Sequence, residues 1–296
     1  MAAAQRRIAY LCSEVTITGS PNRRVDAFEH DLMLAALRPA FAERSMDVVE
    51  VRWDDADFDW SSVDAAIIGT TWDYGNRAQE FLNTLEIISS QTTLFNSVAT
   101  VRWNFDKRYL RELEAQRAAM IPTVWIDEPD GEAIKAAFET LGCDDLVVKQ
   151  QIGASSRGQH RLALGDPLPK MNQPMMAQAF QPSILIEGEY SFIFIDGEFS
   201  HAVLKQAAAG DYRIQSEYGG TESVHSPTRA DLETAAGVLA LVEESPLYAR
   251  VDMIRGETGS LLLMELELIE PYLYVEQGLE LGAMLAAAVV RRLETR

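Results

Sequence analysis

Apolar and polar positions follow two different periods along the first hundred residues. Short apolar runs between polar turns are typical of buried strands, and they occur here at residues 7–12, 48–51, 65–69 and 93–95. Between these runs, apolar side chains recur with helical spacing over residues 26–44 and 77–89. Pro39 is expected to kink or end the first of these helices. Because strands and helices alternate, the sequence predicts a small parallel α/β domain over residues 1–100.

The pattern changes after residue 104, where strands become frequent. A charged amphipathic helix is predicted first, over residues 106–119. The predicted strands that follow are residues 123–126, 146–149, 160–164, 175–179, 190–195, 199–205, 248–254 and 261–269. Further helices are predicted at residues 132–141, 230–244 and 279–293. This pattern favours an α+β region with antiparallel strands, and the lack of a long linker favours close packing.

The composition fits a soluble globular protein with two or three packed subdomains. The chain has 296 residues, of which 47% are hydrophobic and 24% are charged, so it is long enough for a sizeable core. No stretch approaches the roughly 20 apolar residues that cross a bilayer. Residues 1–7 include basic side chains and precede an apolar run that is too short for a secretion signal, so we expect a cytoplasmic location.

The chain is strongly acidic, with 45 Asp and Glu against 26 Lys and Arg and a formal net charge of −19. Such a surface repels phosphate backbones and anionic lipids, so we expect neither nucleic acid nor membrane as a partner. An anionic ligand would need a local cluster of basic side chains and metal. Only two cysteines occur, Cys12 and Cys143, so no disulfide framework is expected and both are interpreted as small core residues.

Common phosphate-binding and catalytic motifs are absent from the sequence. Residues 153–158 have the glycine spacing of a P-loop, but Gln159 and His160 follow in place of Lys and Ser or Thr. No G-x-G-x-x-G follows a predicted strand, and neither G-x-S-x-G nor H-E-x-x-H occurs. The four histidines lack metal-ligand spacing, which favours structural or surface roles.

Acidic side chains alternate along the last two predicted strands. Arg250 and Asp252 share one face of the first strand, and Glu265 and Glu267 share one face of the second. If the strands form a hairpin, three carboxylates and one guanidinium converge. Oxygen ligands of this kind suit Mg²⁺ or Mn²⁺, and clustered carboxylates need a neutralising cation. An antiparallel sheet with an acidic outer face explains the same spacing equally well.

A second candidate segment begins at Lys149, which ends an apolar strand. The Gly- and Ser-rich residues 153–158 follow, and their backbone N–H groups are suited to cradling phosphates, with Arg157 adding positive charge. A strand-end lysine before an ordinary hairpin loop is the structural alternative. A third segment, residues 176–180 followed by Glu189, can offer backbone groups to a purine edge and a carboxylate to a ribose, although plain structure accounts for it as well.

Taken in order, these segments resemble the ATP-grasp superfamily over about residues 100–285, preceded by the α/β domain that usually accompanies that fold. The matching features are Lys107, Lys149 with its Gly/Ser loop, residues 178–180, Gly188 with Glu189, Arg250 with Asp252, and Glu265 with Glu267. The resemblance implies an α/β N-terminal domain followed by an α+β ATP-grasp fold, in which two subdomains with antiparallel sheets clamp ATP. It implies a central or lid subdomain at residues 101–180 and a metal-binding subdomain at residues 181–296.

The resemblance also implies a role for each matching residue. Phosphate contacts fall to Lys107, Lys149 and the loop residues Ser155 and Ser156. Gln178, Ala179 and Phe180 are expected to form the adenine hinge, and Glu189 is expected to bind the ribose. One or two Mg²⁺ ions, or Mn²⁺, fall to Asp252, Glu265 and Glu267, and Arg250 stabilises the transferred phosphoryl group. Relatives commonly have Asn at the third metal position, so Glu267 departs from the pattern and adds negative charge.

A closer resemblance is to the glutathione-synthetase-like branch, which includes the D-cycloserine ring-closing synthetase. It is carried by residues 71–74, 101–104, 201–205 and 210–213 with the glycines at 219 and 220. Lys205 and Arg213 then act as catalytic contacts to the γ-phosphate or substrate carboxylate; solvated residues at a sheet edge are the alternative. Trp72, Asp73 and Tyr74 follow a buried strand, where open α/β sheets place ligands, and are candidate substrate contacts or, for the two aromatics, core residues.

The implied reaction is ATP-dependent ligation or ring closure of a small amino-acid-like substrate through an acylphosphate. Positioning and charge neutralisation provide most of the acceleration in such phosphoryl transfers, which agrees with the lack of a nucleophile–base pair. Two other readings stay open, namely amino-acid addition to a peptide or protein, and nucleotide binding without catalysis. This branch is often multimeric, so a homo-oligomer is also open.

Overall fold

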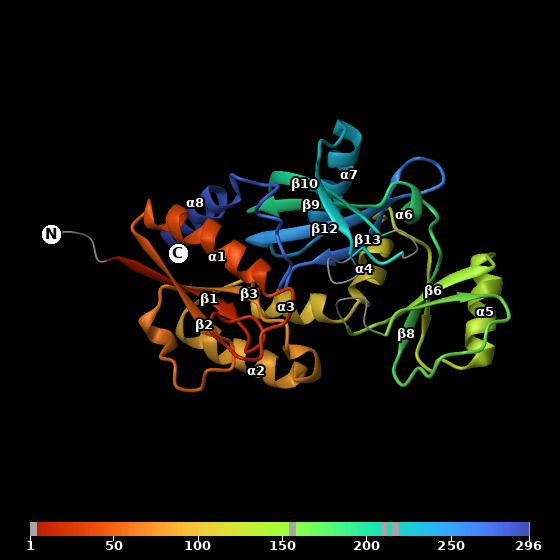
Figure 1. Cartoon of the computed structure of the whole chain (residues 1–296), viewed down its shortest axis with the longest axis horizontal. Helices are drawn as coiled ribbons and strands as arrows, with labels where there is room; N and C mark the ends of the chain where they lie inside the picture. The colour runs from red at the N-terminus through yellow and green to blue at the C-terminus, as the bar shows by residue number, and fades with distance from the viewer. Residues whose placement is uncertain (1–4, 154–157, 209–211, 215–218, 296) are drawn as a thin grey trace.

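The described part of the chain forms three sheets, arranged one after another along the long axis of the molecule (Figure 1). A computed structural model describes residues 5–153, 158–208, 212–214 and 219–295. The first sheet lies near the N-terminus, the second occupies the middle, and the third lies at the opposite end. The fold class is the expected one, an α/β N-terminal part followed by antiparallel sheets.

The first sheet is parallel and has the strand order β2-β1-β3-β4. Its strands and the helices that follow them are β1 (Arg6–Cys12), α1 (Phe28–Ala42), β2 (Met46–Arg52), β3 (Ala65–Thr70), α2 (Ala78–Gln91) and β4 (Thr93–Phe95). All of β3 is buried, as its continuous apolar run predicts. Helix α1 does not end at Pro39 but continues to Ala42, because the proline sits near the C-terminal end, where few backbone hydrogen bonds remain to be lost.

The second sheet is antiparallel, with the order β11-β10-β9-β12-β13. Its elements are β9 (Glu189–Ile195), β10 (Glu198–Gln206), β11 (Thr221–His225), α7 (Arg229–Leu239), β12 (Tyr248–Arg255) and β13 (Leu261–Glu267). The last helix, α8 (Leu281–Glu294), returns to lie beside α1 (Figure 1). Residues of α1, α8 and the first two sheets share one apolar core, so these two sheets are held as one unit.

The third sheet has the order β5-β8-β6-β7 and a core of its own. Its elements are β5 (Thr123–Ile126), α5 (Gly131–Leu141), β6 (Asp145–Gln150), β7 (His160–Ala163) and β8 (Met175–Ala179). The side chain of Asp130 accepts a hydrogen bond from the Ala133 amide and caps α5 at its start. Gly142 ends the helix at φ +62°, a conformation that glycine adopts without steric cost. Short helix α6 (Ser183–Ile186) leads back to the second sheet.

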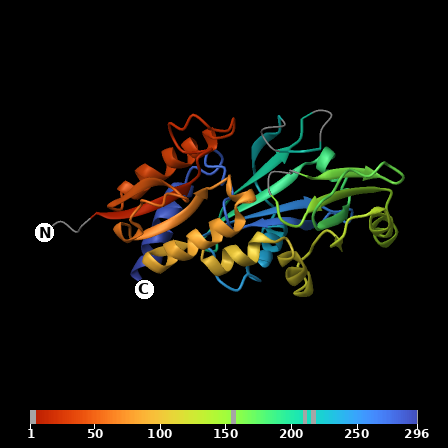
Figure 2. The same cartoon turned by 90° about the horizontal axis from the view of Figure 1, so that it is seen from below.

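Two short helices, α3 (Val98–Phe105) and α4 (Tyr109–Ala115), connect the first sheet to the rest of the chain (Figure 2). The predicted helix over residues 106–119 is therefore too long, and α3 was not predicted. Within the described residues, the outer edge of β13 meets only an isolated bridge between Met120 and Leu263, and side chains from these helices bond to its backbone. The Asn104 amide donates to the Leu266 carbonyl at 2.8 Å and accepts from the Leu268 amide at 3.0 Å, while the Leu266 amide donates to the Tyr109 hydroxyl at 2.8 Å.

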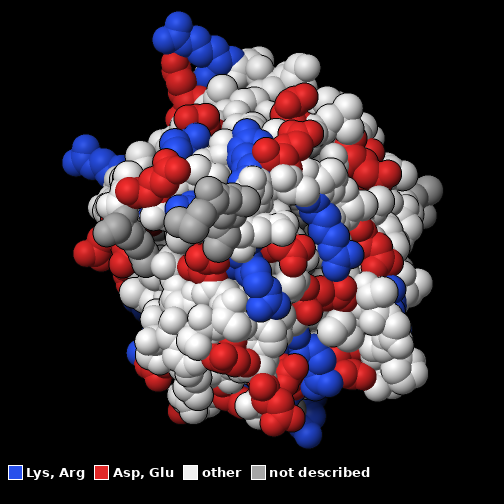
Figure 3. Space-filling model, turned by 90° about the vertical axis from the view of Figure 1, so that its left-hand side faces the viewer, with Lys and Arg blue, Asp and Glu red and all other residues white. Residues whose placement is uncertain are grey.

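No helix within the described residues is both long and apolar enough to cross a membrane. On the face shown in Figure 3, acidic and basic side chains are interspersed, so the negative charge is not gathered there into a single acidic patch.

Candidate functional site

The last two strands form an antiparallel hairpin that brings the acidic side chains together. Arg250 lies opposite Glu267, and Asp252 lies opposite Glu265. Directly opposed residues of an antiparallel pair project from the same face, so these four side chains form one cluster. Asp252 and Arg250 are almost fully buried, which rules out the alternative of an acidic sheet face open to solvent for this pair.

Two basic side chains hold the buried carboxylate of Asp252. The Arg250 guanidinium binds it with Nη2 at 3.0 Å from Oδ2 and also pairs with Glu267. Lys205 reaches it from β10, with Nζ 3.4 Å from Oδ1, and also pairs with Glu189 at the start of β9. Burial alone raises the pKa of Asp252, but Arg250 and Lys205 outweigh this and lower it to about 2. Asp252 is therefore an anion at neutral pH.

The nearby cations do not fully offset the effect of burial on Glu267 and Glu189, whose pKa values are both raised. Burial raises the pKa of Glu267, and although Arg250 opposes this, Asp252 and Glu265 add to it. Burial also raises the pKa of Glu189 against the opposing Lys205. Clustered carboxylates of this kind are relieved by a divalent cation. The oxygen-only donor set fits Mg²⁺.

Two further lysines approach Glu265 from other elements. Lys107, between α3 and α4, places its ammonium 2.7 Å from the Glu265 carboxylate and 2.7 Å from the Gly153 carbonyl. Lys149 projects from β6 and forms no ion pair within the described part of the chain. Burial lowers the pKa of Lys149 and Lys107 adds to this, whereas Glu265 opposes it. Lys149 is half-buried, and an amine held near acidic groups without an ion-pair partner is suited to an added anion.

The predicted nucleotide hinge lies at the end of β8, across the third sheet from β7. Gln178 is buried, and its side-chain amide donates to the Thr123 hydroxyl at 2.9 Å. Ala179 is half-buried, and the Phe180 amide donates to the Asp145 carbonyl at 2.9 Å. Ser155 and Ser156 lie outside the described residues.

The predicted substrate segment lies between the first two sheets. The Trp72 indole donates to the Glu270 carbonyl at 3.3 Å, and the Tyr74 hydroxyl donates to the Glu270 carboxylate at 2.8 Å. Asp73 accepts from the Trp53 indole at 2.7 Å. These contacts bring the segment close to the end of the metal-site hairpin. Arg213 is half-buried and interacts with other residues.

Sequence reasoning missed two side chains of this cluster. Ser191 of β9 donates to Asp252, and Glu270 follows the hairpin at its C-terminal end. Glu270 had one available signal, because it is an acidic residue directly before Pro271 and three residues after Glu267. Ser191 had none, since its position beside Asp252 depends on the β9–β12 pairing.

Comparison with known proteins identifies the family. In structure, the chain resembles D-cycloserine synthetase DcsG, with a TM-score of 0.82 and 24% identity over 97% of this chain and 99% of that one. It resembles the ATP-grasp ligase PsnB, with a TM-score of 0.66 and 14% identity over 97% of this chain and 99% of that one. In sequence, it is 30% identical to the cycloserine biosynthesis protein DcsG of Streptomyces lavendulae over 262 residues, 82% of this chain and 87% of that protein. The chain is an ATP-grasp ligase.

Other matches agree with this assignment. Residues 8–96 match the family model of the N-terminal domain of D-cycloserine synthetase DcsG. This ATP-grasp ligase is also 28% identical to glutathione synthetase of Prochlorococcus marinus over 160 residues, about half of each chain (51% and 50%). Its fold matches D-alanine–D-alanine ligase from Bacillus anthracis, with a TM-score of 0.66 and 15% identity over 98% of both chains. The protein is therefore an enzyme that uses ATP to form C–N bonds.

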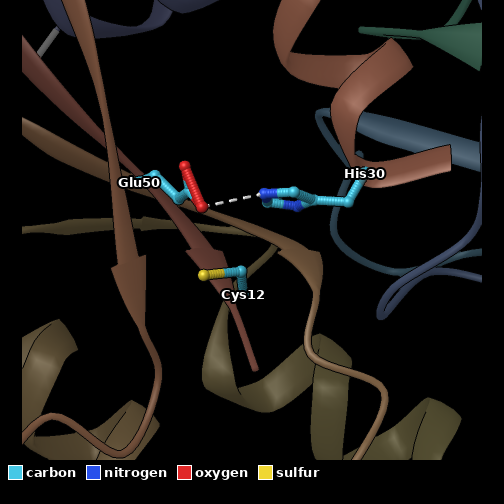
Figure 4. Close-up of side chains that lie close together, drawn as sticks. All are labelled: Cys12, His30 and Glu50. Carbon is cyan, nitrogen blue, oxygen red and sulfur yellow. Dashed lines mark ion pairs between the residues drawn. The ribbon is translucent and has the colours of Figure 1, made fainter. Parts of the chain in front are cut away.

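The N-terminal sheet of this ATP-grasp ligase holds another polar cluster, formed by Cys12, His30 and Glu50 (Figure 4). The His30 ring lies between Thr70, with Nδ1 2.6 Å from its hydroxyl, and Glu50, with Nε2 3.2 Å from Oε1. The Cys12 thiol donates to the Val51 carbonyl at 3.3 Å, and burial raises the pKa of this thiol. A protonated thiol is a poor metal ligand, so we interpret the cluster as a buried structural network.

Replacing Glu50 with Gln should make the protein less stable at neutral pH. Burial raises the pKa of Glu50, but His30 and the Thr18 amide outweigh it and lower it to about 2. A depressed carboxyl pKa contributes stability above the unfolded value near 4.5, and this stability is lost as pH falls toward 2. Allowing for partial solvent access, we expect a loss of about 1–2 kcal/mol at pH 7 that shrinks toward pH 3, measured by urea denaturation.

Asp31→Asn is the matched control, because Asp31 pairs with Arg23 on the surface and its side chain is 48% exposed. It should change the unfolding free energy by less than about 0.5 kcal/mol. A Glu50→Gln loss that does not depend on pH would contradict the ionic interpretation.

Proposed function

We propose that this ligase activates the carboxylate of a small amino-acid-like substrate with Mg·ATP and joins it to an amine, either of a second molecule or of the same one. The cross-strand register of the hairpin carries this proposal, because it sets Asp252 opposite Glu265 and Arg250 opposite Glu267. The names of two relatives, cycloserine biosynthesis protein DcsG and D-alanine–D-alanine ligase, support a small amino-acid-like substrate.

The residues of the cluster divide into a metal-binding and a phosphate-binding group. Asp252, Glu265 and Glu267 would hold Mg²⁺, which supplies charge neutralisation at the phosphate oxygens when bound. Phosphate contacts would come from Lys107, Lys149, Lys205, Arg213 and Arg250. Adenine and ribose would lie along Gln178, Ala179, Phe180 and Glu189, and substrate along Trp72, Asp73 and Tyr74.

The side chains of this site act by position and charge. The substrate carboxylate oxygen attacks the γ-phosphorus, the bond to the β-phosphate oxygen breaks, and ADP leaves. Arg250 and Lys205, which both contact Asp252, would stabilise the spreading negative charge of the transferred group. The amine then attacks the acyl carbon and phosphate departs. Asp252, Arg250 and Lys205 are buried, which would limit the access of water to the acylphosphate from their side.

The test is a coupled assay for ADP release with pooled small D- and L-amino acids. We expect release that requires both Mg²⁺ and an amino-acid pool, and that narrows to one pool on subdivision. Release that proceeds without an acceptor, or no release with any pool, would count against the proposal. Release that requires a peptide or protein acceptor would favour the peptide-modifying alternative, in line with the precursor-bound PsnB structures.

A further inference from the structure

Glu270 is an acidic side chain at the junction of the first two sheets. It follows β13 and lies where the Tyr74 hydroxyl donates to its carboxylate at 2.8 Å and the Trp72 indole donates to its carbonyl at 3.3 Å. The Tyr248 hydroxyl fixes the preceding residue, 2.9 Å from the Ile269 carbonyl, and also bonds the Ile68 carbonyl at the end of β3. Backbone and side chain of Glu270 are therefore both held in place.

The charges around Glu270 come from every neighbouring element. Lys107 lies between α3 and α4, Arg250 on β12, Glu265 on β13, and the Tyr74 phenol on the turn after β3. Lys107 is engaged by Glu265, and Arg250 by Asp252 and Glu267. Among the described residues Glu270 has no ion-pair partner, and its fixed donor is the neutral Tyr74 hydroxyl. One carboxylate oxygen remains for a ligand.

Amine attack on the acylphosphate requires a proton acceptor on the substrate side of the cluster. The predicted acylphosphate forms beside Glu265 and Asp252, while the predicted substrate contacts lie on the Trp72–Tyr74 side. An amine that attacks from that side must lose a proton, and the other acidic groups of the cluster are already paired with cations. We propose that Glu270, oriented by Tyr74, binds the attacking amine and takes its proton. This inference rests on the proposed function.

The proposed step exchanges a phosphate at the acyl carbon for the amine nitrogen. The amine nitrogen forms a bond to the acyl carbon, the bond from that carbon to the phosphate oxygen breaks, and inorganic phosphate leaves with the electron pair. The amine binds as an ammonium, and its first proton passes to a Glu270 carboxylate oxygen before the attack. The second nitrogen proton leaves with the inorganic phosphate. Burial raises the pKa of Glu270 to about 7, against the opposing Tyr74, Lys107 and Arg250, which matches the acidity of a general base at neutral pH.

The decisive experiment replaces the nucleophile in the Glu270→Gln variant. Hydroxylamine is neutral at pH 7, so it attacks an acylphosphate without first giving up a proton to the protein. With Mg·ATP and the amino-acid pool that supports ADP release, Glu270→Gln should form C–N product at least about 100-fold more slowly than the wild type. Added hydroxylamine should still yield hydroxamate at a rate within about threefold of the wild type.

The outcomes separate the role of Glu270 from the proposed function of the enzyme. Loss of both products, or retention of both, would overturn the role of Glu270. If the wild type forms neither ADP nor hydroxamate, the proposed function is wrong, and the inference that rests on it is wrong as well. Glu244→Gln is the matched control, because Glu244 also accepts a hydroxyl hydrogen bond from a distant helix, that of Thr100 at 3.2 Å, but is exposed. It should leave both reactions unchanged.

Tyr74→Phe provides a second variant that keeps the ring stacked on Phe81 at 4.4 Å. Because the Tyr74 hydrogen bond lowers the pKa of Glu270, its loss should move the acidic limb of the pH profile for amine attack to higher pH. The hydroxylamine reaction should show no such shift. An unshifted limb would contradict the proposal even if Glu270→Gln folds poorly.

Discussion

Replacing Glu265 with Gln is expected to lower Mg-dependent ADP release by at least about 1000-fold while leaving the fold intact. Glu265 lies opposite Asp252 and contacts Lys107, so its carboxylate would bridge the metal and a phosphate lysine. The amide keeps the shape of the side chain but removes the charge that holds a divalent cation. ADP release over a range of Mg²⁺ concentrations measures the effect.

Glu257→Gln tests whether any acidic change in this hairpin has the same result. Glu257 lies in the exposed turn between β12 and β13. We expect its removal to leave both ADP release and the melting temperature unchanged. If Glu265→Gln keeps full activity, the metal assignment is wrong.

Replacing Arg250 with Met should produce the largest loss of stability, about 3–5 kcal/mol in the free energy of unfolding. The Met side chain fills similar space, but Asp252 and Glu267 lose their shared cation, and the Tyr272 carbonyl loses a donor at 3.0 Å. Within the described residues, Asp252 keeps Lys205 as its one remaining ion-pair partner and Glu267 keeps none, and weakening the neutralisation of a buried carboxylate costs more than the ion pair contributes. Urea denaturation measures the change.

Arg291→Met is the control for this variant. Arg291 pairs with Asp196 at 2.8 Å, but its side chain is 50% exposed. Exposed ion pairs contribute little, so we expect a loss of less than about 1 kcal/mol. Equal losses of unfolding free energy for the two variants would show that burial of the Arg250 cluster does not determine its contribution to stability.

The acidic hairpin was predictable because strand alternation depends only on sequence spacing. Arg250 with Asp252, and Glu265 with Glu267, project together in any antiparallel hairpin, and the structure has that register. Helix α3 was missed because residues 98–105 contain β-branched and aromatic side chains with weak helix propensity. Ser97 caps the helix locally, but the bond from Asn104 to β13 is a tertiary contact that sequence spacing does not give.

The spacing of residues along the sequence could not predict contacts between distant segments. Tyr74 and Glu270 meet across 196 positions, and no local period relates them. The same holds for Cys12, His30 and Glu50, which come from two strands and a helix. The helix predicted over residues 106–119 stops early because Arg117 adopts φ +69°, which breaks the helical turn.

The side chains that seal the edge of β13 have a mechanical consequence. Asn104 and Tyr109 flank Lys107, and the Ile121 amide binds the Leu263 carbonyl at 3.4 Å, so the chain from α3 to this point is attached to the hairpin. Lys149 belongs instead to the third sheet, which begins only after Pro122. Lys107 also bonds the chain directly after β6, where its amide donates to the Gln151 carbonyl at 2.9 Å and its ammonium to the Gly153 carbonyl at 2.7 Å. Lys107 therefore joins the hairpin to the third sheet through Glu265 and Gly153, whereas Lys149 is carried by the third sheet alone.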